Sequence, residues 1–139
     1  MTRDEAEKLI GKTVHCWSAL NGCYIGELLE VLPSRPWRGR VKILAVTEYP
    51  VQGLSDFRPG FRARKPAGYG EIRDFGGINI KEYCGEVPDY KASLVQVLQT
   101  GIERLERNVA YLAETGRRDA LLEKWLTVLR ERLEEAKKM

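Results

Sequence analysis

Arginines and aromatic rings alternate in two short segments near the middle of the chain, and this pattern has the clearest chemistry. The segments are residues 36–40 (PWRGR) and 57–65 (FRPGFRARK). Guanidinium groups pair with phosphates, and aromatic rings stack on unpaired bases. The pattern predicts a surface that contacts a polyanionic partner, with nucleic acid ahead of an acidic protein surface. With a nearby tyrosine, the candidate residues are Trp37, Arg38, Arg40, Arg58, Phe61, Arg62, Arg64, Lys65 and Tyr69.

The charge distribution along the chain favours the same surface. Residues 35–73 contain nine Arg or Lys and three Asp or Glu, a local net charge of +6, while the whole chain carries only +3. A basic middle on a faintly acidic body can give one positive face. The alternative is a solvated loop in which Phe61 and Tyr69 plug one end of the β-domain, while arginine stems cover apolar surface.

Three cysteines and one histidine supply the ligand types of a zinc site. No C-x₂-C pair is present among Cys16, Cys23 and Cys84, and adjacent His15 and Cys16 would point to opposite faces of a strand. An odd number of cysteines without a dense framework indicates reduced, structural thiols. The glycine segments also lack a nucleotide-binding motif. We therefore expect no metal, no cofactor and no catalytic residue.

The chain changes character near Pro88, and this change predicts how it is organised. The earlier part is interrupted by glycines and prolines between short β-type runs, whereas the later part has no proline and a nearly unbroken helical period. We predict an α+β fold with two parts. Residues 1–88 would form a small antiparallel β-barrel, SH3-like or OB-like, with a short N-terminal helix. Residues 89–139 would form a C-terminal antiparallel helical hairpin.

Local signals place the elements of the first part. The capping-box pair Thr2 and Glu5 predicts a helix that ends near Ile10, and Asn21-Gly22 predicts a hairpin turn. Five strands are expected, at residues 12–18, 23–32, 40–49, 71–75 and 77–83. Residues 50–70, rich in glycine and proline, are expected to form a long loop. The residues expected to face the core from the first helix and the last strand are Ala6, Leu9, Ile10, Ile78 and Ile80.

Heptad spacing predicts two helices that pack along one seam. Asp89 can cap the first helix, Thr115-Gly116 can end it, and Asp119 lies in the first turn of the second. Gly101 permits a close approach of the two backbones. The seam residues are expected to be Val95, Leu98, Ile102, Leu105, Val109 and Leu112 on the first helix, and Leu122, Leu126, Leu129, Leu133 and Ala136 on the second.

The second helix has an additional apolar stripe, formed by Leu121, Trp125 and Val128. A two-helix hairpin buries one seam only, so this stripe must contact something else. One possibility is packing within the same chain. The other is a protein partner or a second copy of the chain, which would make the stripe an oligomer interface.

These observations predict a non-enzymatic binding or adaptor protein that contacts nucleic acid through its arginine-rich loops. The alternative is a purely structural protein–protein interaction subunit, such as an assembly component or a phage-type accessory factor. A third possibility is a small enzyme with an unrecognised site. The start of the chain lacks an apolar signal-peptide core and no run is long enough to span a bilayer. We therefore expect a cytoplasmic protein without membrane contact.

Overall fold

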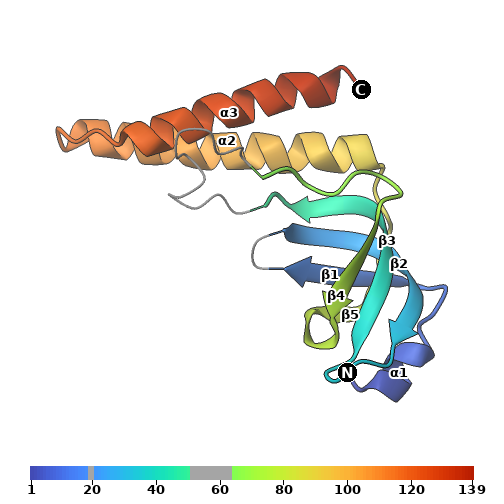
Figure 1. Cartoon of the computed structure of the whole chain (residues 1–139). Helices are drawn as coiled ribbons and strands as arrows, with labels where there is room; N and C mark the ends of the chain where they lie inside the picture. The colour runs from blue at the N-terminus through green and yellow to red at the C-terminus, as the bar shows by residue number, and fades with distance from the viewer. Residues whose placement is uncertain (19–20, 51–63) are drawn as a thin grey trace.

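A computed structural model of the chain describes residues 1–18, 21–50 and 64–139 (Figure 1). It confirms the α+β class, with five strands followed by two long helices. The elements in chain order are α1 (Arg3–Glu7), β1 (Thr13–Ser18), β2 (Gly22–Leu32), β3 (Arg38–Glu48), β4 (Ile72–Gly76), the 3₁₀ turn η2 (Gly77–Asn79), β5 (Ile80–Glu82), α2 (Tyr90–Glu114) and α3 (Ala120–Lys137).

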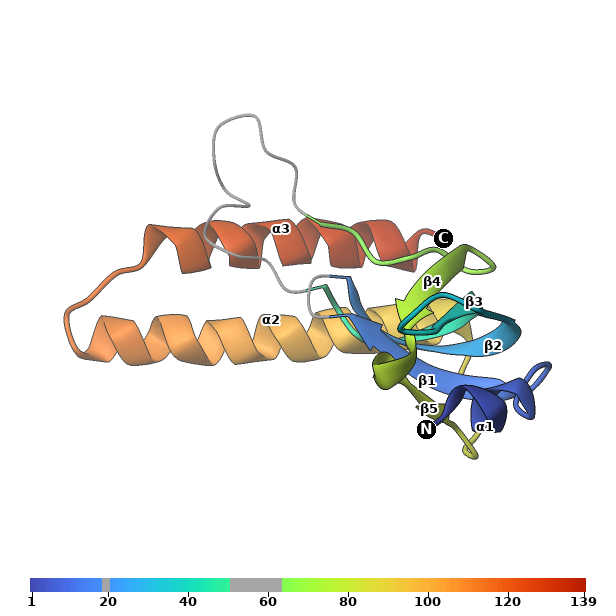
Figure 2. The ribbon, with the colours of Figure 1, turned by 60° about the horizontal axis from the view of Figure 1, so that its bottom comes forward.

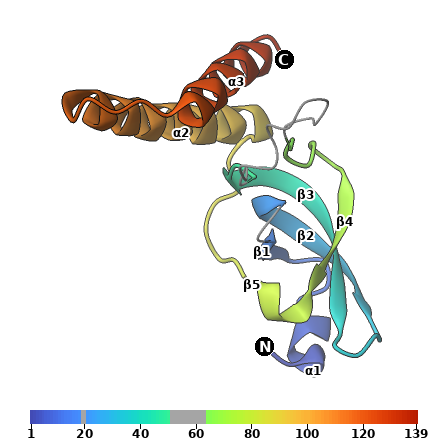
Figure 3. The same cartoon turned by 60° about the vertical axis from the view of Figure 1, so that its left-hand side comes forward.

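The five strands form one antiparallel sheet with the order β4-β3-β2-β1-β5. The sheet curls strongly, as Figure 3 shows, but the predicted closed barrel is wrong because β4 and β5 remain its two edges. After β4, the short turn η2 carries the chain across to β1, where β5 pairs over only three residues. Gly39 on β3 allows the two ends of the curled sheet to approach each other. A Cβ at Gly39 would lie 2.5 Å from Ile80 Cδ1, so the glycine leaves room for Ile80 to reach across the core.

The inside of the curl is the core of the molecule. All five strands contribute buried side chains, including Val14, Leu28, Ile43, Phe75 and Ile80. Their burial follows from the period of two residues in a strand, which sends alternate side chains to the same face.

Two predicted core residues are instead exposed. Ile78 is 90% exposed, because residues 77–79 form a 3₁₀ turn and not a strand, so the alternation that buries Ile80 does not include it. Ile10 is 46% exposed, because α1 ends at Glu7. The predicted cap of α1 is confirmed, since Thr2 Oγ1 accepts from the backbone N–H of Glu5 at 3.2 Å.

The helices α2 and α3 pack side by side, and α2 also lies against β3 (Figure 2). Asp89 caps α2 by accepting from Ala92 N–H. Asp119 is the N-cap of α3 and not a residue of its first turn, because its carboxylate accepts from the N–H groups of Leu121 and Leu122.

The predicted helical seam has six buried and five half-buried members, and those nearest the hairpin tip, Val109, Leu112 and Leu122, are half-buried. Its buried members are Leu98, Ile102, Leu105, Leu126, Leu129 and Ala136, and its half-buried members are Val95, Val109, Leu112, Leu122 and Leu133. Gly101 faces Leu129 closely, since a Cβ there would lie 3.2 Å from Leu129 Cδ1. The end of the hairpin that joins the two helices projects beyond the sheet (Figures 1 and 2). One continuous core cluster nevertheless joins the sheet to the near half of the helices, from Val46 to Leu94 and Leu98.

Candidate functional site

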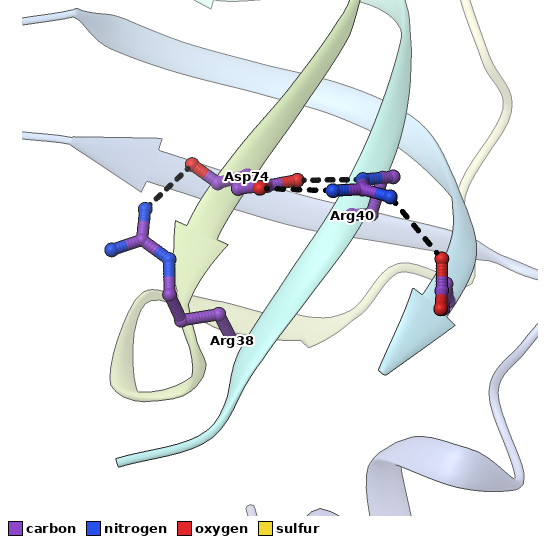
Figure 4. Close-up of polar contacts among 4 residues, drawn as sticks. Arg38, Arg40 and Asp74 are labelled. Atoms are coloured by element: carbon purple, nitrogen blue, oxygen red, sulfur yellow. Dashed lines mark hydrogen bonds and ion pairs between the residues drawn. The ribbon is translucent and has the colours of Figure 1, made fainter. Parts of the chain in front are cut away.

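The first group of candidate residues lies on the outer surface where β2, β3 and β4 run together (Figure 4). Arg40 Nε lies 3.0 Å from Asp74 Oδ1, and Arg40 Nη1 lies 3.3 Å from Glu30 Oε2. Arg38 Nη2 donates to the backbone carbonyl of Asp74 at 3.4 Å. The cross-strand pairing of Arg40 with Asp74 sets these contacts. Carboxylates on neighbouring strands therefore already pair with Arg40, whereas Arg38 makes one hydrogen bond to a backbone carbonyl.

The aromatic ring of this group has a structural role. A Cβ at Gly77 would lie 2.2 Å from Trp37 Cε2, so the indole ring lies directly on the glycine backbone. Gly77 N–H also donates to the carbonyl of Trp37 at 3.0 Å. Trp37 packs against the core in this position, and its ring covers the turn between β4 and β5.

The remaining candidates do not join this group. Arg58, Phe61 and Arg62 lie outside the described residues. Lys65 and Tyr69 belong to a segment that contacts the helices, and Tyr69 is 67% exposed with its ring centroid 6.1 Å from that of Tyr90. Arg64, in the same segment, is half-buried. The structure therefore separates the predicted arginine–aromatic surface into at least two places.

A pocket of about 330 Å³ lies between this segment, the end of β3 and the two helices. Its apolar floor consists of Leu94, Leu98 and Ala136, which are at most 8% exposed. Tyrosines from three parts of the chain form its walls: Tyr49, Tyr69 and Tyr90. The charged and terminal side chains that line it are Lys65, Arg132, Glu135 and Met139.

Two tyrosine hydroxyls hold the wall of the pocket through one residue, Ala67. Ala67 N–H donates to the hydroxyl of Tyr24 at 3.0 Å, and the hydroxyl of Tyr90 donates to the carbonyl of Ala67 at 2.5 Å. The Tyr24 hydroxyl in turn donates to the carbonyl of Asn21. Because Tyr24 is fully buried, this chain of bonds joins the interior of the sheet to the pocket wall.

A serine fixes the other wall. Ser93 on α2 is buried, and its hydroxyl accepts from Val46 N–H at 3.0 Å and donates to the carbonyl of Tyr90 at 2.7 Å. The first turn of α2 is therefore bonded to the backbone of β3. The pocket is formed before any ligand arrives, because its walls are fixed by hydrogen bonds within the chain.

The pocket combines neutral phenols with an excess of positive charge. Burial raises the pKa of Tyr90 to about 12. Burial also raises the pKa of Tyr49, and the nearby Arg132 acts in the opposite direction. Among residues 1–18, 21–50 and 64–139, no carboxylate lies within ion-pair distance of Lys65 or Arg132. Among the described side chains that line the pocket, two are cationic and Glu135 is the one acid, so these side chains sum to a formal charge of +1.

Two of the three thiols, Cys16 and Cys23, are poorly suited to nucleophilic chemistry. Burial raises the pKa of Cys16 to about 12, and burial together with the Glu48 carboxylate raises that of Cys23 to about 11. Cys23 Sγ donates to Glu48 Oε2 at 3.4 Å. His15 Nε2 lies 3.2 Å from Thr47 Oγ1. Within the described ranges, no three His, Cys, Asp or Glu side chains form a cluster that could hold a metal ion.

The apolar stripe of α3 is half-buried at each of its three positions, Leu121, Trp125 and Val128. Trp125 packs against the core cluster of its own chain. In the part of the chain that the structure describes, no helix is both long and apolar enough to cross a membrane.

Sequence reasoning missed most of the pocket. Tyr49, Tyr90, Arg132 and Glu135 are separated by up to 86 positions, and no local motif marks any of them. A usable signal was the polar Ser93 within an apolar helical face, since a buried hydroxyl requires a partner.

Three comparisons with known proteins agree with one another. The family model described as kinase-associated protein B (KapB) matches residues 20–124. Kinase-associated lipoprotein B of Bacillus subtilis (strain 168) is 40% identical over 79 residues, which cover 52% of this chain and 59% of that relative. The match thus spans less than two thirds of the relative's length. The crystal structure of kinase-associated protein B from Bacillus cereus superposes with a TM-score of 0.68 at 28% identity, and covers 94% of this chain and 97% of that one.

These comparisons overturn the main functional prediction from the sequence. Nucleic-acid binding by a polyanion-binding surface is wrong, because the matching family, relative and solved structure are all described as kinase-associated. The comparisons favour the alternative, a protein–protein interaction subunit. Arg40 misled because its carboxylate partners, Glu30 and Asp74, come from other strands and are not apparent from the spacing.

Proposed function

This chain belongs to the kinase-associated protein B family, and from that premise we propose that it is a protein-binding factor that docks on a protein kinase. The observation that carries the proposal is the family match itself. It extends over β2 to β5, the whole of α2 and the start of α3, so it includes four of the five strands and the lining residues of the pocket from Tyr49 to Leu98, but neither β1 nor the lining residues of α3.

The surface of the chain supports a binding role. Its helical hairpin projects from the sheet (Figure 2), and the pocket beside its base has exposed aromatic and apolar residues at the rim, Tyr69 and Met139. Exposed aromatic and methionine side chains are enriched where proteins contact each other.

Direct binding tests the proposal. The purified chain is immobilised, and each protein kinase encoded by the source genome is passed over it in turn while biolayer interferometry records association. We expect saturable binding by at least one kinase. Single-stranded and duplex oligonucleotides at two salt concentrations serve as controls and should not bind. If every kinase fails to bind the folded chain, the proposal is refuted.

We further propose that Leu121, Trp125 and Val128 form the contact between two copies of the chain. α3 begins at the end of the hairpin away from the sheet, so its first turns are packed mainly by α2 (Figure 1). Light scattering after size-exclusion chromatography compares wild type with Trp125→Glu and with Thr127→Glu, an exposed position on the same helix. We expect dimers in wild type and Thr127→Glu but monomers in Trp125→Glu. A monomeric wild type contradicts self-association.

A further inference from the structure

The pocket between the sheet and the helices has the features of an anchor site for a protein partner. It is concave, its floor is apolar, and its volume of about 330 Å³ accommodates one large side chain and part of its backbone. Interface anchors are typically bulky side chains in such preformed pockets. Its rim is open, since Tyr69 and Met139 are 67% and 64% exposed. A site for a small molecule would more often enclose most of its ligand.

The charge of the pocket adds a second requirement on the ligand. Among the described side chains that line it, Lys65 and Arg132 contribute hydrogen-bond donors and positive charge, and Glu135 is the one carboxylate. The hydroxyl of Tyr90 already donates its hydrogen to the carbonyl of Ala67, so it is not a free donor for a ligand. An incoming group that carries a carboxylate would therefore find two cationic partners, and charge-assisted hydrogen bonds are stronger than neutral ones.

From these observations we propose that the pocket receives one bulky apolar side chain of the partner, of phenylalanine or leucine type. A carboxylate next to that side chain pairs with Lys65 and Arg132. This inference rests on the proposed function, because it names how the partner protein is held. The hydrogen bonds of Ala67 and Ser93 keep the walls in place, which reduces the ordering cost of binding.

Small probes test the chemistry of the pocket without any kinase. N-acetyl-L-phenylalanine carries both the ring and the carboxylate, N-acetyl-L-phenylalaninamide lacks the charge, and N-acetylglycine lacks the ring. Amide shifts in ¹H–¹⁵N spectra report binding. We expect saturable shifts at residues 67–69 and 94–98 with the first probe, at least threefold weaker binding of the amide, and no shift with N-acetylglycine. Equal binding of all three probes, or no shift at all, overturns the inference.

Gly68 offers a way to block the pocket without disturbing the fold. Gly68 lines the pocket, its φ lies outside the left-handed region, and a Cβ there would meet no atom within 4 Å. Gly68→Phe should therefore fill the mouth and weaken N-acetyl-L-phenylalanine at least tenfold. Gly76→Phe is the matched control. Gly76 has the same open surroundings and does not line the pocket, so this variant should bind like wild type. Loss of probe binding in both variants contradicts the assignment.

Charge variants test the second requirement. In Lys65→Gln/Arg132→Gln, N-acetyl-L-phenylalanine should bind no more tightly than its amide. Lys8→Gln/Arg107→Gln removes the same charge from exposed positions outside the pocket and should keep the preference for the carboxylate. A preference that survives in the first variant refutes the role of Lys65 and Arg132.

The same variants separate this inference from the proposed function. A kinase that binds the wild type should bind Gly68→Phe at least tenfold more weakly and Gly76→Phe equally well. Full kinase binding by Gly68→Phe, with probe binding lost, would make the pocket a small-molecule site and overturn the inference. The probe titrations decide the pocket's chemistry even when no kinase binds, because they use the wild-type chain and the probes alone.

Discussion

The arginine group on β3 and the pocket at the base of the hairpin contain similar residue types but differ in how those residues are satisfied. On β3, Arg40 has two carboxylate partners and Trp37 covers a glycine backbone. Among the described side chains that line the pocket, Arg132 and Lys65 outnumber the one carboxylate, Glu135, and the aromatic rings leave an open cavity. Residue composition alone therefore does not identify a binding surface. What matters is whether the chain itself already provides the partners.

The largest effect is expected from the hydroxyl that holds the pocket wall. Tyr24→Phe removes the acceptor of Ala67 N–H and leaves this buried group without its bond. Stability should fall by about 1–3 kcal/mol, measured as the change in the free energy of unfolding in urea. Tyr111→Phe, at a 65% exposed position, should leave stability unchanged. Equal stability of all three proteins would mean that the wall does not depend on this bond.

The second largest effect is expected at alkaline pH, where ionisation of Tyr90 should lower the stability of the fold. The pKa of Tyr90 is about 12 in the fold against an ordinary value of 10. The folded chain therefore holds this proton more tightly, and the added stability is complete below pH 10 and is lost as pH rises towards 12. Near pH 11 the loss should be about 1 kcal/mol. Urea midpoints between pH 8 and 11.5 measure it, and Tyr90→Phe should have a smaller dependence on pH. An identical slope in the variant would contradict this assignment.

Around Trp37 and Arg40, the stability of the fold should depend more on packing than on charge. Gly77→Ala places a methyl group where the Trp37 ring lies, so the ring must move. We expect a loss of about 1 kcal/mol, at the low end for overpacking because Trp37 is half-exposed and can shift. Thermal unfolding measures the change. Gly76→Ala, next to it in open space, serves as the control and should leave stability nearly unchanged.

The smallest effect is expected from the ion pairs of Arg40. Its side chain is 41% exposed and that of Asp74 is 32% exposed, so solvent screens their attraction. A double-mutant cycle of Arg40→Gln and Asp74→Asn should give a coupling smaller than the effects above, and it should decrease as salt is added. A coupling that does not decrease at high salt would show that this pair is not a screened surface pair and would weaken the contrast with the pocket.

The secondary structure could largely be predicted because its signals are local. Asp89 and Asp119 mark the starts of the two helices, and the heptad spacing selects Leu98, Leu126 and Leu129 for the seam. Ile78 was misplaced because alternation continues through the sequence although the backbone turns at residues 77–79. Local patterns predict a side chain's face only while the element continues.

The site could not be predicted because its parts are brought together by the fold. Tyr49 directly follows a strand, Tyr69 lies in a connecting segment, Tyr90 begins a helix and Arg132 lies near the end of another. Likewise, the partners of Arg40 depend on the registers of β2 and β4 against β3, which include irregular positions. The sequence pattern showed Arg40 and not the two carboxylates that pair with it.

The position of Ser93 determines where the hairpin is attached to the sheet. α2 has 25 residues and is therefore about 37 Å long. Its first turn is hydrogen-bonded to β3 through the Ser93 hydroxyl, while its other end projects beyond the sheet (Figure 1). The attached end of α2 lies next to the tyrosine-walled pocket. A sideways force on the connection between the helices therefore acts on the Ser93 attachment, next to the pocket walls that hydrogen bonds already hold in place.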